Sequence, residues 1–364
     1  MEAGARAPTI FLSVGEPSGD LHGAALARAL RRRIPGVRLI GLGGARMAAE
    51  GVELMAGLDQ LSVMGFAEVL AHLPYFIRLR RRVFDALESE RVDLVIPVDY
   101  PGFNLRLARH ARAGGIPVLY YIAPQVWAWH ASRARDLARD ADAVAVILPF
   151  EEEFLRRAGA NAHFVGHPLL DATPPPATHA EWIAGIGLDP ERPVLALFRE
   201  TATEVVARNP AVQPVIGAAS DLDRALFDGA GWPLADDPRA LLHHATAALV
   251  KSGTTTLEAA LARTPFVVVY RMNALSYQIA RRLVKVPHIA LANLVADERL
   301  APELIQDAAK PSTLADELLP LLDAGSPRRA EMLAGFERMR ARLGGGGAAV
   351  RVAEMAAELL ERTR

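Results

Sequence analysis

The sequence predicts an α/β protein with two domains, each built on a mostly parallel β-sheet. Short apolar segments typical of strands alternate with longer segments of helical periodicity along the whole chain. This alternation is typical of parallel sheets whose two faces are covered by helices. The chain has 364 residues, more than one hydrophobic core usually supports. One doubly wound sheet of all these strands is the less favoured alternative.

The expected strands form two series separated by a proline-rich break. The first series is Thr9–Val14, Val37–Leu42, Leu94–Val98, Val118–Ile122, Ala143–Leu148 and His163–Val165. The second is Val194–Phe198, Val212–Ala218, Ala245–Val250, Phe266–Tyr270 and Ile289–Leu291. Between them, Pro174, Pro175 and Pro176 exclude a helix or a central strand.

These breaks divide the chain. We expect a first domain at 1–170, a linker at 171–192, a second domain at 193–343 and a closing amphipathic helix within 344–364, after the glycine run. That helix either packs back on the first domain or exchanges with another subunit. The second arrangement would make the protein a homo-oligomer, and the sequence does not decide between the two.

Composition excludes several classes of function. The net charge of −1 gives no electrostatic reason to expect a nucleic-acid partner. The absence of cysteine excludes thiolate nucleophiles, disulfides and cysteine-bound metals. The first eight residues lack the apolar core of a signal peptide, and the apolar runs are too short to span a bilayer. We expect a cytoplasmic protein that meets a membrane only at its surface.

The stretch from Ser252 to Glu258 is the most informative part of the chain. Its flanking segments predict a strand, a tight turn and a helix. Amide groups at a helix start, with small hydroxyl residues beside them, can bind phosphate. Gly253 permits a close ligand approach, and Glu258 falls where a carboxylate can accept hydrogen bonds from a ribose. The alternative is an ordinary helix capped by serine or threonine.

Two segments of the first domain follow strands where α/β proteins bind ligands. The loop after Ser13 carries Glu16, Ser18, Gly19 and Asp20, and it lacks the G-x-G-x-x-G pattern of dinucleotide sites. Asp99 follows the strand Leu94–Val98 and is a candidate general base for a hydroxyl group. A role in capping a turn is the alternative for Asp99.

Two further segments allow two interpretations each. Trp127 and Trp129, beside Gln125, can form a sugar platform or plug the core. The segment from Leu61 to Phe84 has apolar residues at helical spacing beside a run of arginines. This pattern suits a helix at an anionic membrane surface, but a core helix with a solvated basic face is the favoured interpretation from the residues alone.

Six motifs, in order along nearly the whole chain, resemble those of lipid-A-disaccharide synthase, a family of GT-B glycosyltransferases (family 19). The motifs are Gly15 to Asp20, Asp99 with Phe103-Asn104, Pro124 to Trp129, Gly166-His167-Pro168, Ser252 to Glu258, and Asn293-Leu294-Val295 with Pro302 to Gln306.

The resemblance implies two Rossmann-like domains whose parallel sheets face each other across a cleft. It also implies a metal-independent inverting transfer that needs no cofactor. The donor is UDP-2,3-diacylglucosamine and the acceptor is the lipid 2,3-diacylglucosamine 1-phosphate. The products are the β-1,6-linked disaccharide 1-phosphate and UDP. The D-x-D pairs at Asp140 and Asp221 match metal motifs in spacing only, and we expect no metal.

The resemblance also assigns roles to residues. Asp99 is the expected base. Donor binding is expected from Ser252, Gly253, Thr254, Thr255, Glu258, Asn293 and Gln306. Acceptor binding is expected from Glu16, Ser18, Gly19, Asp20, Gln125 and Trp127. Acyl-chain or membrane contact is expected from Val63, Met64, Phe66, Phe76 and Leu79, on the cytoplasmic face of the inner membrane.

One family motif is missing. The family has Pro-Gly-Ser-Arg after the first strand of the second domain, whereas Phe198 runs directly into Arg199, which we expect to begin a helix. The 13 residues from Arg199 to Ala211 cannot hold a phosphate loop and a full helix. Loss of a cationic contact predicts weaker UDP binding and slower turnover.

Three hypotheses follow from this departure. The chain is an active synthase in which other residues replace the loop, or an inactive deletion variant that still binds lipid or nucleotide. The third is an enzyme like UDP-N-acetylglucosamine 2-epimerase on the same fold.

Overall fold

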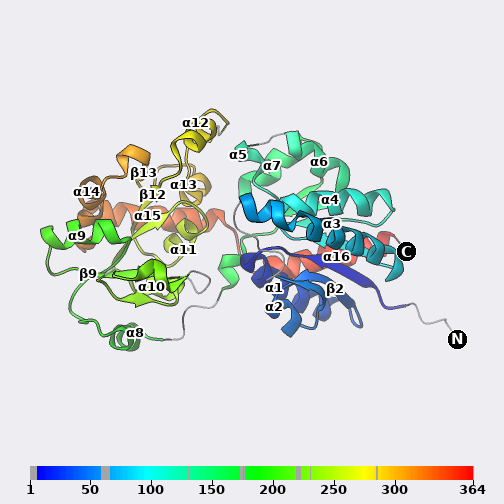
Figure 1. Ribbon diagram of the computed structural model, residues 1–364, viewed down its shortest axis with the longest axis horizontal. Coiled ribbons are helices and arrows are strands. Elements are labelled where there is room, and N and C mark those ends of the chain that lie inside the picture. The colour runs from blue at the N-terminus through cyan, green and yellow to red at the C-terminus, as the bar shows by residue number, and fades with distance from the viewer. Residues whose placement is uncertain are drawn as a thin grey trace. The chain divides into compact units, whose positions relative to one another are not determined.

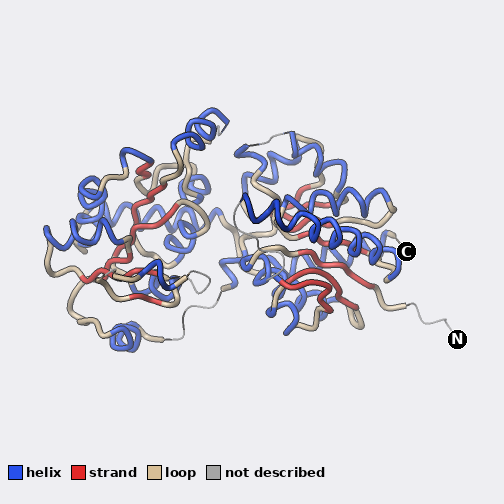
Figure 2. The backbone as a smooth tube through the Cα atoms, viewed as in Figure 1, coloured by secondary structure: helices blue, strands red, loops and turns tan. Residues whose placement is uncertain are grey.

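A computed structural model describes residues 6–58, 66–129, 132–172, 175, 177–218, 223–229, 231–283 and 286–363. The chain forms two compact units (Figures 1 and 2). The first unit is Met1–Asp171 with Gly345–Arg364, and the second is Ala172–Gly344. The boundaries lie beside the proline and glycine runs of the sequence. No described helix is both long and apolar enough to cross a bilayer.

The first unit contains parallel strands only, among those described. β1 (Thr9–Ser13), β2 (Arg38–Gly43), β3 (Glu53–Gly57) and β4 (Leu94–Pro97) lie in the order β3-β2-β1-β4. β5 (Leu119–Tyr121), β6 (Ala143–Val146) and β7 (Ala162–Phe164) form a second sheet in that order. Isolated bridges from Val95 to Val118 and from Val98 to Tyr121 join β4 to β5.

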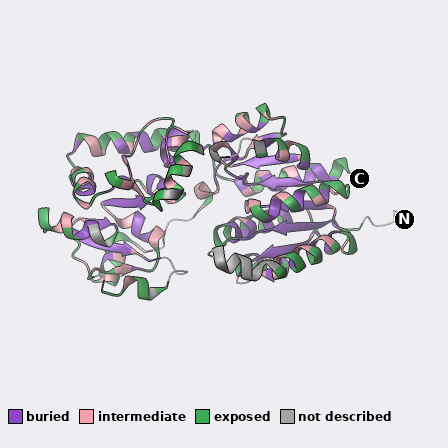
Figure 3. Ribbon diagram, turned by 45° about the horizontal axis from the view of Figure 1, so that its top comes forward, coloured by how far each residue is buried: buried purple, intermediate pink, exposed green. Residues whose placement is uncertain are grey.

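Helices cover both faces of this array. They are α1 (Pro17–Arg33), α2 (Ala45–Ala49), α3 (Phe66–Ser89), α4 (Pro101–Ala113), α5 (Val126–Trp129), α6 (Ser132–Asp140), α7 (Pro149–Arg157), the 3-10 helix η2 (Pro168–Asp171) and α16 (Ala348–Arg362). One core includes Leu26 of α1 and Val352 of α16, and the other includes Val83 of α3 and Leu107 of α4. The buried strands lie between these helices (Figure 3).

The closing helix α16 belongs to the first unit. It packs against α1, and the carboxylate of Asp171 accepts the N–H groups of Gly347 and Ala348 at its start. Arg351 donates to the carbonyl oxygen of Val165 at 2.9 Å. The last residues of the chain thus complete the core formed by the first ones.

The second unit repeats the same strand order. Its sheet is β10-β9-β8-β11-β12-β13, all parallel. The strands are β8 (Val194–Ala196), β9 (Gln213–Gly217), β10 (Leu234–Ala235), β11 (Ala247–Lys251), β12 (Phe266–Tyr270) and β13 (Glu303–Ile305). The helices are α8 (His179–Ile186), α9 (Arg199–Arg208), η3 (Arg224–Phe227), α10 (Pro238–His244), α11 (Thr255–Leu261), α12 (Ala274–Leu283), α13 (Leu291–Ala296), η4 (Gln306–Ala308), α14 (Pro311–Leu322) and α15 (Pro327–Arg342).

The α/β class with parallel sheets is confirmed, with corrections at the edges. Ile289–Leu291 is not a strand, because Leu291 begins α13. β3, β10 and β13 were not expected; each is a short edge strand, paired on one side only and without a long apolar run. The segment 171–192, expected as a linker, contains α8, whose start is capped by Thr178 and Glu181.

Gly41 offers a test of the close approach between β1 and β2. A Cβ atom at Gly41 would lie 1.8 Å from the carbonyl oxygen of Leu12, and Gly41 has φ of +156°. We expect Gly41→Ala to lower the free energy of unfolding of the first unit by about 3 kcal/mol. Urea denaturation followed by circular dichroism, with hydrogen exchange of the β1 amides, measures the change.

Gly102 in α4 is the matched control, because a Cβ atom there meets nothing within 4 Å. Gly102→Ala should change stability by less than about 1 kcal/mol. Equal effects of the two substitutions would contradict the account of Gly41.

Candidate functional site

The sheet order places a switch point between β1 and β4 in the first unit. The chain leaves β1 toward β2 on one side and later returns to β4 on the other, so the loops after β1 and β4 diverge at their carboxyl ends. Ligands of open α/β sheets bind at such points. The loop from Val14 to Glu16 follows β1, and Asp99 comes shortly after β4.

Asn104 of α4 ties these two strand ends together. Its amide accepts the Ser13 hydroxyl at 2.6 Å and donates to the carbonyl oxygens of Ser13, Val98 and Asp99 at 3.1, 3.2 and 2.8 Å. The Asn104 side chain is fully buried, so each bond is made away from water. This is the physical reason for an asparagine in the Phe103-Asn104 motif.

Asp99 lies in a constrained backbone. Asp99 and Tyr100 have φ of 46° and 48°, in the left-handed region that side chains disfavour. Hydrogen bonds hold this conformation: the Tyr120 hydroxyl donates to the Asp99 carbonyl oxygen at 2.8 Å, and the Asp99 N–H donates to Tyr121 at 3.0 Å. Two consecutive strained residues thus lie at the candidate base.

The surroundings of Asp99 make its carboxylate more basic. Burial raises the pKa of Asp99 to about 6, and the nearby charge of Glu16 adds to the rise. The group is still ionised at neutral pH. A carboxylate of this pKa is suited to accept a proton from a hydroxyl group.

The loop after β1 contacts Asp99's neighbour directly. A Cβ atom at Gly15 would lie 2.3 Å from the ring of Tyr100, so only glycine fits there. Glu16 at the end of this loop and Ser18 in the first turn of α1 are exposed, whereas Gly19 is buried beside Val14. The structure therefore leaves Glu16 and Ser18 accessible to an acceptor.

Asp20 is a structural residue in the first turn of α1. It is 5% exposed, and its carboxylate accepts the N–H groups of Gly44, Arg46 and Met47 at 2.8, 3.1 and 3.1 Å. These bonds cap the start of α2. We therefore correct the expected acceptor contact of Asp20 to a positioning role.

Glu151 is a site residue that the sequence did not reveal. It is 2% exposed in α7 and accepts hydrogen bonds from Trp127 Nε1 at 3.0 Å and from the Leu148 N–H at 3.1 Å. Burial raises the pKa of Glu151 to about 7, against these hydrogen bonds, and Asp99 raises it further. Glu151 thus orients Trp127, while Gln125 nearby is exposed.

Two histidines of this unit are shielded from water, His167 fully buried and His22 half-buried. Burial lowers the pKa of His22 to about 4 and that of His167 to about 3, so both are neutral at neutral pH. His167 Nδ1 accepts the Leu169 N–H at 3.2 Å, which places the proton of the neutral ring on Nε2. His167, in the Gly166-His167-Pro168 motif, therefore organises the end of the first unit.

The second unit has its own switch point, between β8 and β11. The turn after β11 is held by hydroxyl groups: Ser252 donates to the Ile289 carbonyl oxygen at 2.7 Å, and Thr256 bridges the Gly253 carbonyl oxygen and the Ala292 N–H. Gly253 has φ of +140° with nothing within 4 Å of a Cβ position. The space above Gly253 is open for a ligand.

The side chains of Glu258, Asn293 and Gln306 differ in whether they are already hydrogen-bonded within the described part of the protein. Burial raises the pKa of Glu258, with Arg239 opposing and Asp237 adding to the rise. Asn293 is fully buried and bonds to Ala301 and Glu303, and Gln306 pairs with the backbone of Met272 at 2.8 and 2.9 Å.

The amides of Asn293 and Gln306 are thus already engaged. Both residues hold loops beside the turn, which corrects the expectation that they contact the donor directly. Thr254 and Thr255 are exposed and half-buried, respectively.

The crossover from β8 to β9 is short. β8 ends at Ala196 and α9 begins at Arg199, so only Leu197 and Phe198 lie between them. Helix α9 then runs ten residues to Arg208. No Pro-Gly-Ser-Arg turn precedes the helix, and Arg199 is its first residue, as expected.

The expected membrane segment is only partly described. Val63, Met64 and the side chain of Phe66 lie outside the described residues. Leu79 is 1% exposed in the core of the first unit, so its expected acyl contact is wrong, and Phe76 packs partly buried against the same core. The exposed side of α3 instead presents Ile77, 40% exposed, beside three exposed arginines, Arg78, Arg81 and Arg82.

Nothing in the described residues assembles a metal site of three or more suitable side chains. Asp140 pairs with Arg109 and Arg139, and Asp142 pairs with Arg112. Asp221 lies outside the described residues.

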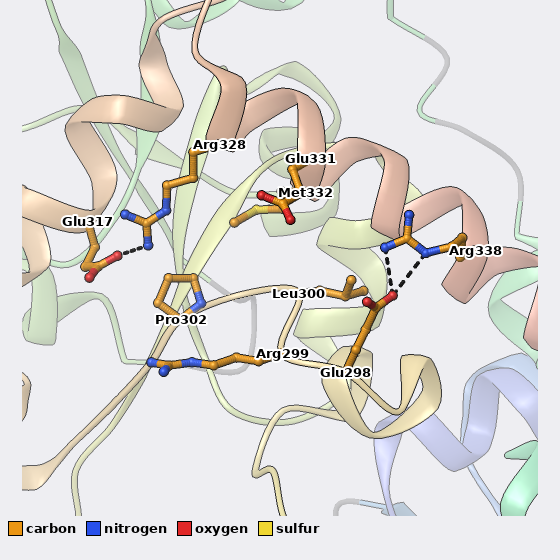
Figure 4. Close-up of a pocket in the computed structure, with 9 residues that line it drawn as sticks. All are labelled: Glu298, Arg299, Leu300, Pro302, Glu317, Arg328, Glu331, Met332 and Arg338. Carbon is orange, nitrogen blue, oxygen red and sulfur yellow. Dashed lines mark hydrogen bonds and ion pairs between the residues drawn. The ribbon is translucent and has the colours of Figure 1, made fainter.

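A polar pocket of about 330 Å³ in the second unit is not a site candidate (Figure 4). It lies beside Pro302, before the start of β13, and so away from the carboxyl ends of the strands. Arg338 pairs with Glu298 at 2.8 Å and Arg328 pairs with Glu317, so these charges satisfy one another.

Sequence comparisons give one consistent result. The family model for lipid-A-disaccharide synthetase matches residues 10–227 and 233–343. The lipid-A-disaccharide synthase of Myxococcus xanthus is 40% identical over 375 residues, covering 97% of this chain and 98% of the relative. That of Geobacter sulfurreducens is 39% identical, covering 96% and 97%. The 375-residue alignment is longer than this chain, so it contains gaps here.

Solved structures share the fold. A putative UDP-N-acetylglucosamine 2-epimerase from Listeria monocytogenes matches with TM-score 0.66 and 14% identity over 99% of this chain and 98% of its own. The calicheamicin glycosyltransferase CalG4 matches with TM-score 0.58 and 21% identity over 99% and 100%. At these identities the likeness shows the GT-B type of fold alone.

The raised pKa of Glu151 gives a stability test. The folded state keeps this proton up to about pH 7, whereas an ordinary glutamate loses it near 4.5. The free energy of unfolding therefore falls as pH rises through this window. We expect Glu151→Gln to remove about 1 kcal/mol per pH unit of that slope between about pH 5 and 6.5.

Urea denaturation across this pH range measures the slope. Glu153→Gln, at an exposed position of the same helix, is the control and should leave the slope as in the wild type. An unchanged slope in Glu151→Gln would show that Glu151 ionises normally.

Proposed function

The chain belongs to the lipid-A-disaccharide synthetase family, and we propose that it transfers a 2,3-diacylglucosamine unit from UDP to 2,3-diacylglucosamine 1-phosphate. The products are the β-1,6-linked disaccharide 1-phosphate and UDP. The observation that carries the proposal is the family match over residues 10–227 and 233–343. Support comes from the geometry, since Asp99 and the Ser252 turn each follow a strand at a switch point.

Asp99 is the proposed general base. Its carboxylate takes the proton of the acceptor's 6-hydroxyl while that oxygen attacks the anomeric carbon of the donor. The bond from this carbon to the diphosphate breaks, and UDP leaves with its electron pair. A single displacement inverts the anomeric centre. The pKa of about 6 supports this role, because the base is ionised yet more basic than an ordinary aspartate.

The turn after β11 is the proposed donor site. Ser252, Gly253, Thr254 and Thr255 would surround the diphosphate, and Glu258 would accept hydrogen bonds from the ribose. The open space at Gly253 supports a close approach of the phosphates. Asn293 and Gln306 would act indirectly, by holding the neighbouring loops.

The first unit would bind the acceptor and contact the membrane. Glu16, Ser18, Gly19, Gln125 and Trp127 are proposed to surround the acceptor sugar. The basic and apolar outer side of α3 would contact an anionic membrane surface, which suits an enzyme with lipid substrates. We propose a peripheral position on the cytoplasmic face of the inner membrane.

Paired substitutions test the division of roles. We expect Asp99→Asn to lower kcat at least about a hundredfold with little change in UDP affinity, because it removes only the base. Glu258→Gln should weaken UDP binding about tenfold, because it removes a charged hydrogen-bond acceptor. Release of UDP and formation of disaccharide give kcat, and calorimetric titration gives the Kd of UDP.

The pH dependence sharpens this test. In the wild type, kcat/KM should fall below about pH 6, where Asp99 takes up a proton. An active Asp99→Asn enzyme with an unchanged acid limb would contradict the assignment of the base. If the protein converts UDP-N-acetylglucosamine to its 2-epimer and forms no disaccharide, the proposed transfer is wrong and the chain is an epimerase.

The short crossover predicts a weak donor site. Insertion of Pro-Gly-Ser-Arg between Phe198 and Arg199 should tighten UDP binding about tenfold, because it adds a cation facing the diphosphate. Insertion of Pro-Gly-Ser-Ala is the control and supplies the turn without the charge. Equal UDP affinities of the two insertion variants would contradict this explanation.

A further inference from the structure

An apolar groove of about 470 Å³ opens in the second unit, at the carboxyl ends of β8, β9, β11 and β12. Its walls include Phe198, Leu226, Phe227, Leu249 and Val269. Phe198 is 47% exposed and Leu226 is 70% exposed, although both are large hydrophobic side chains. Unpartnered apolar surface of this kind is typical of a ligand site.

The groove exists because the crossover is short. Helix α9 has ten residues, a length of about 15 Å, and packs beside α14 on this face of the sheet (Figure 1). The helix follows β8 after two residues, so no longer loop follows this strand. Thr201 of α9 and Leu314 of α14 both line the groove.

Two cations stand among the apolar walls. Lys251 is the last residue of β11 and Arg271 follows β12, on the same faces of their strands as Leu249 and Val269. Arg271 donates to the carbonyl oxygen of Ala309. Lys251 is exposed, and no ion pair of its side chain occurs within the described part of the chain.

We propose that this groove holds an acyl chain of the UDP-diacylglucosamine donor, with the Lys251 ammonium group against the donor's diphosphate. The inference rests on the proposed function. Lys251 directly precedes Ser252, so it stands where the phosphate turn meets the apolar walls. An anionic head joined to an apolar tail matches this arrangement.

The size of the groove favours a small ligand over another protein chain. Its volume lies within the roughly 300–1,000 Å³ of small-molecule sites. A stable interface between two protein chains covers about 800 Å² on each partner, a far larger surface than a groove of this volume offers. The positive charge of Lys251 also favours an occupant with an anionic group at one end, as the donor has.

Chain-length dependence of binding tests the proposal. The full chain is titrated calorimetrically with UDP and with UDP-glucosamine bearing acyl chains of increasing length. In the wild type, Kd should fall about fourfold for each added methylene until the groove is filled. In Leu226→Glu, a charge enters the wall at an exposed position, so the Kd of UDP stays within about twofold while the chain-length dependence is lost.

Val350→Glu is the matched control, because Val350 is an exposed hydrophobic residue (54%) on α16 of the first unit. It should bind every ligand as the wild type does. If Leu226→Glu keeps the full chain-length dependence, the proposal is overturned. Lys251→Ala should weaken UDP and the acylated donor by the same factor of about ten, because it removes only the head-group contact.

Photo-crosslinking locates the chain directly. A donor with a diazirine at its acyl end should label peptides from residues 194–227. Labelling confined to residues 66–89 would overturn the proposal and leave the proposed reaction intact. Conversely, chain-length dependence with no disaccharide formed would support the groove and contradict the proposed reaction.

Discussion

The reversal of strand order within each unit is the constraint on which this structure depends. β1 lies between β2 and β4, and β8 lies between β9 and β11, so consecutive crossovers leave in opposite directions. The loops at the carboxyl ends of these central strands must diverge, which opens a place for a ligand without cutting into either core. Asp99 and the Ser252 turn lie at these two places for the same topological reason.

Different hydrogen-bond networks stabilise the loops at the two switch points. In the first unit, the buried amide of Asn104 binds three carbonyl groups and the Ser13 hydroxyl, and thereby fixes the unfavourable backbone of Asp99. In the second, Ser252 and Thr256 anchor the turn to the segment from Ile289 to Ala292. Such buried, satisfied networks are rigid, and rigidity suits groups that must meet a reacting atom.

The second unit lacks, after β8, the Pro-Gly-Ser-Arg turn that the family resemblance led us to expect. The two-residue connection from β8 to α9 leaves no room for a turn with a cation. The same shortening uncovers the apolar walls around Phe198 and Leu226, beside Lys251. The length of this connection therefore affects both the electrostatics and the shape of the proposed donor site.

The sequence predicted the fold well because alternating strands and helices are a local pattern. It missed β3, β10 and β13, since an edge strand paired on one side needs no long apolar run. Helical periodicity identified α3 but not which side faces the core, so Leu79 was misplaced. Motif order identified the site loops, but not which polar groups were already bonded internally, as Asp20 is.

Glu151 was missed for a related reason. It stands in a Glu-Glu-Glu run that reads as the solvated start of a helix, and only its contact with Trp127 shows that it is buried. The one available signal was indirect, because a buried tryptophan N–H needs an acceptor.

Hydrogen exchange with sequential ligands tests the central claim most directly, namely that each switch point binds one substrate. UDP alone should protect the amides of residues 251–258 and 289–293 and leave residues 14–20 and 99–104 unchanged. Addition of the lipid monosaccharide 1-phosphate should then protect residues 14–20 and 99–104. Protection of the first unit by UDP alone, with residues 251–258 unaffected, would contradict the account.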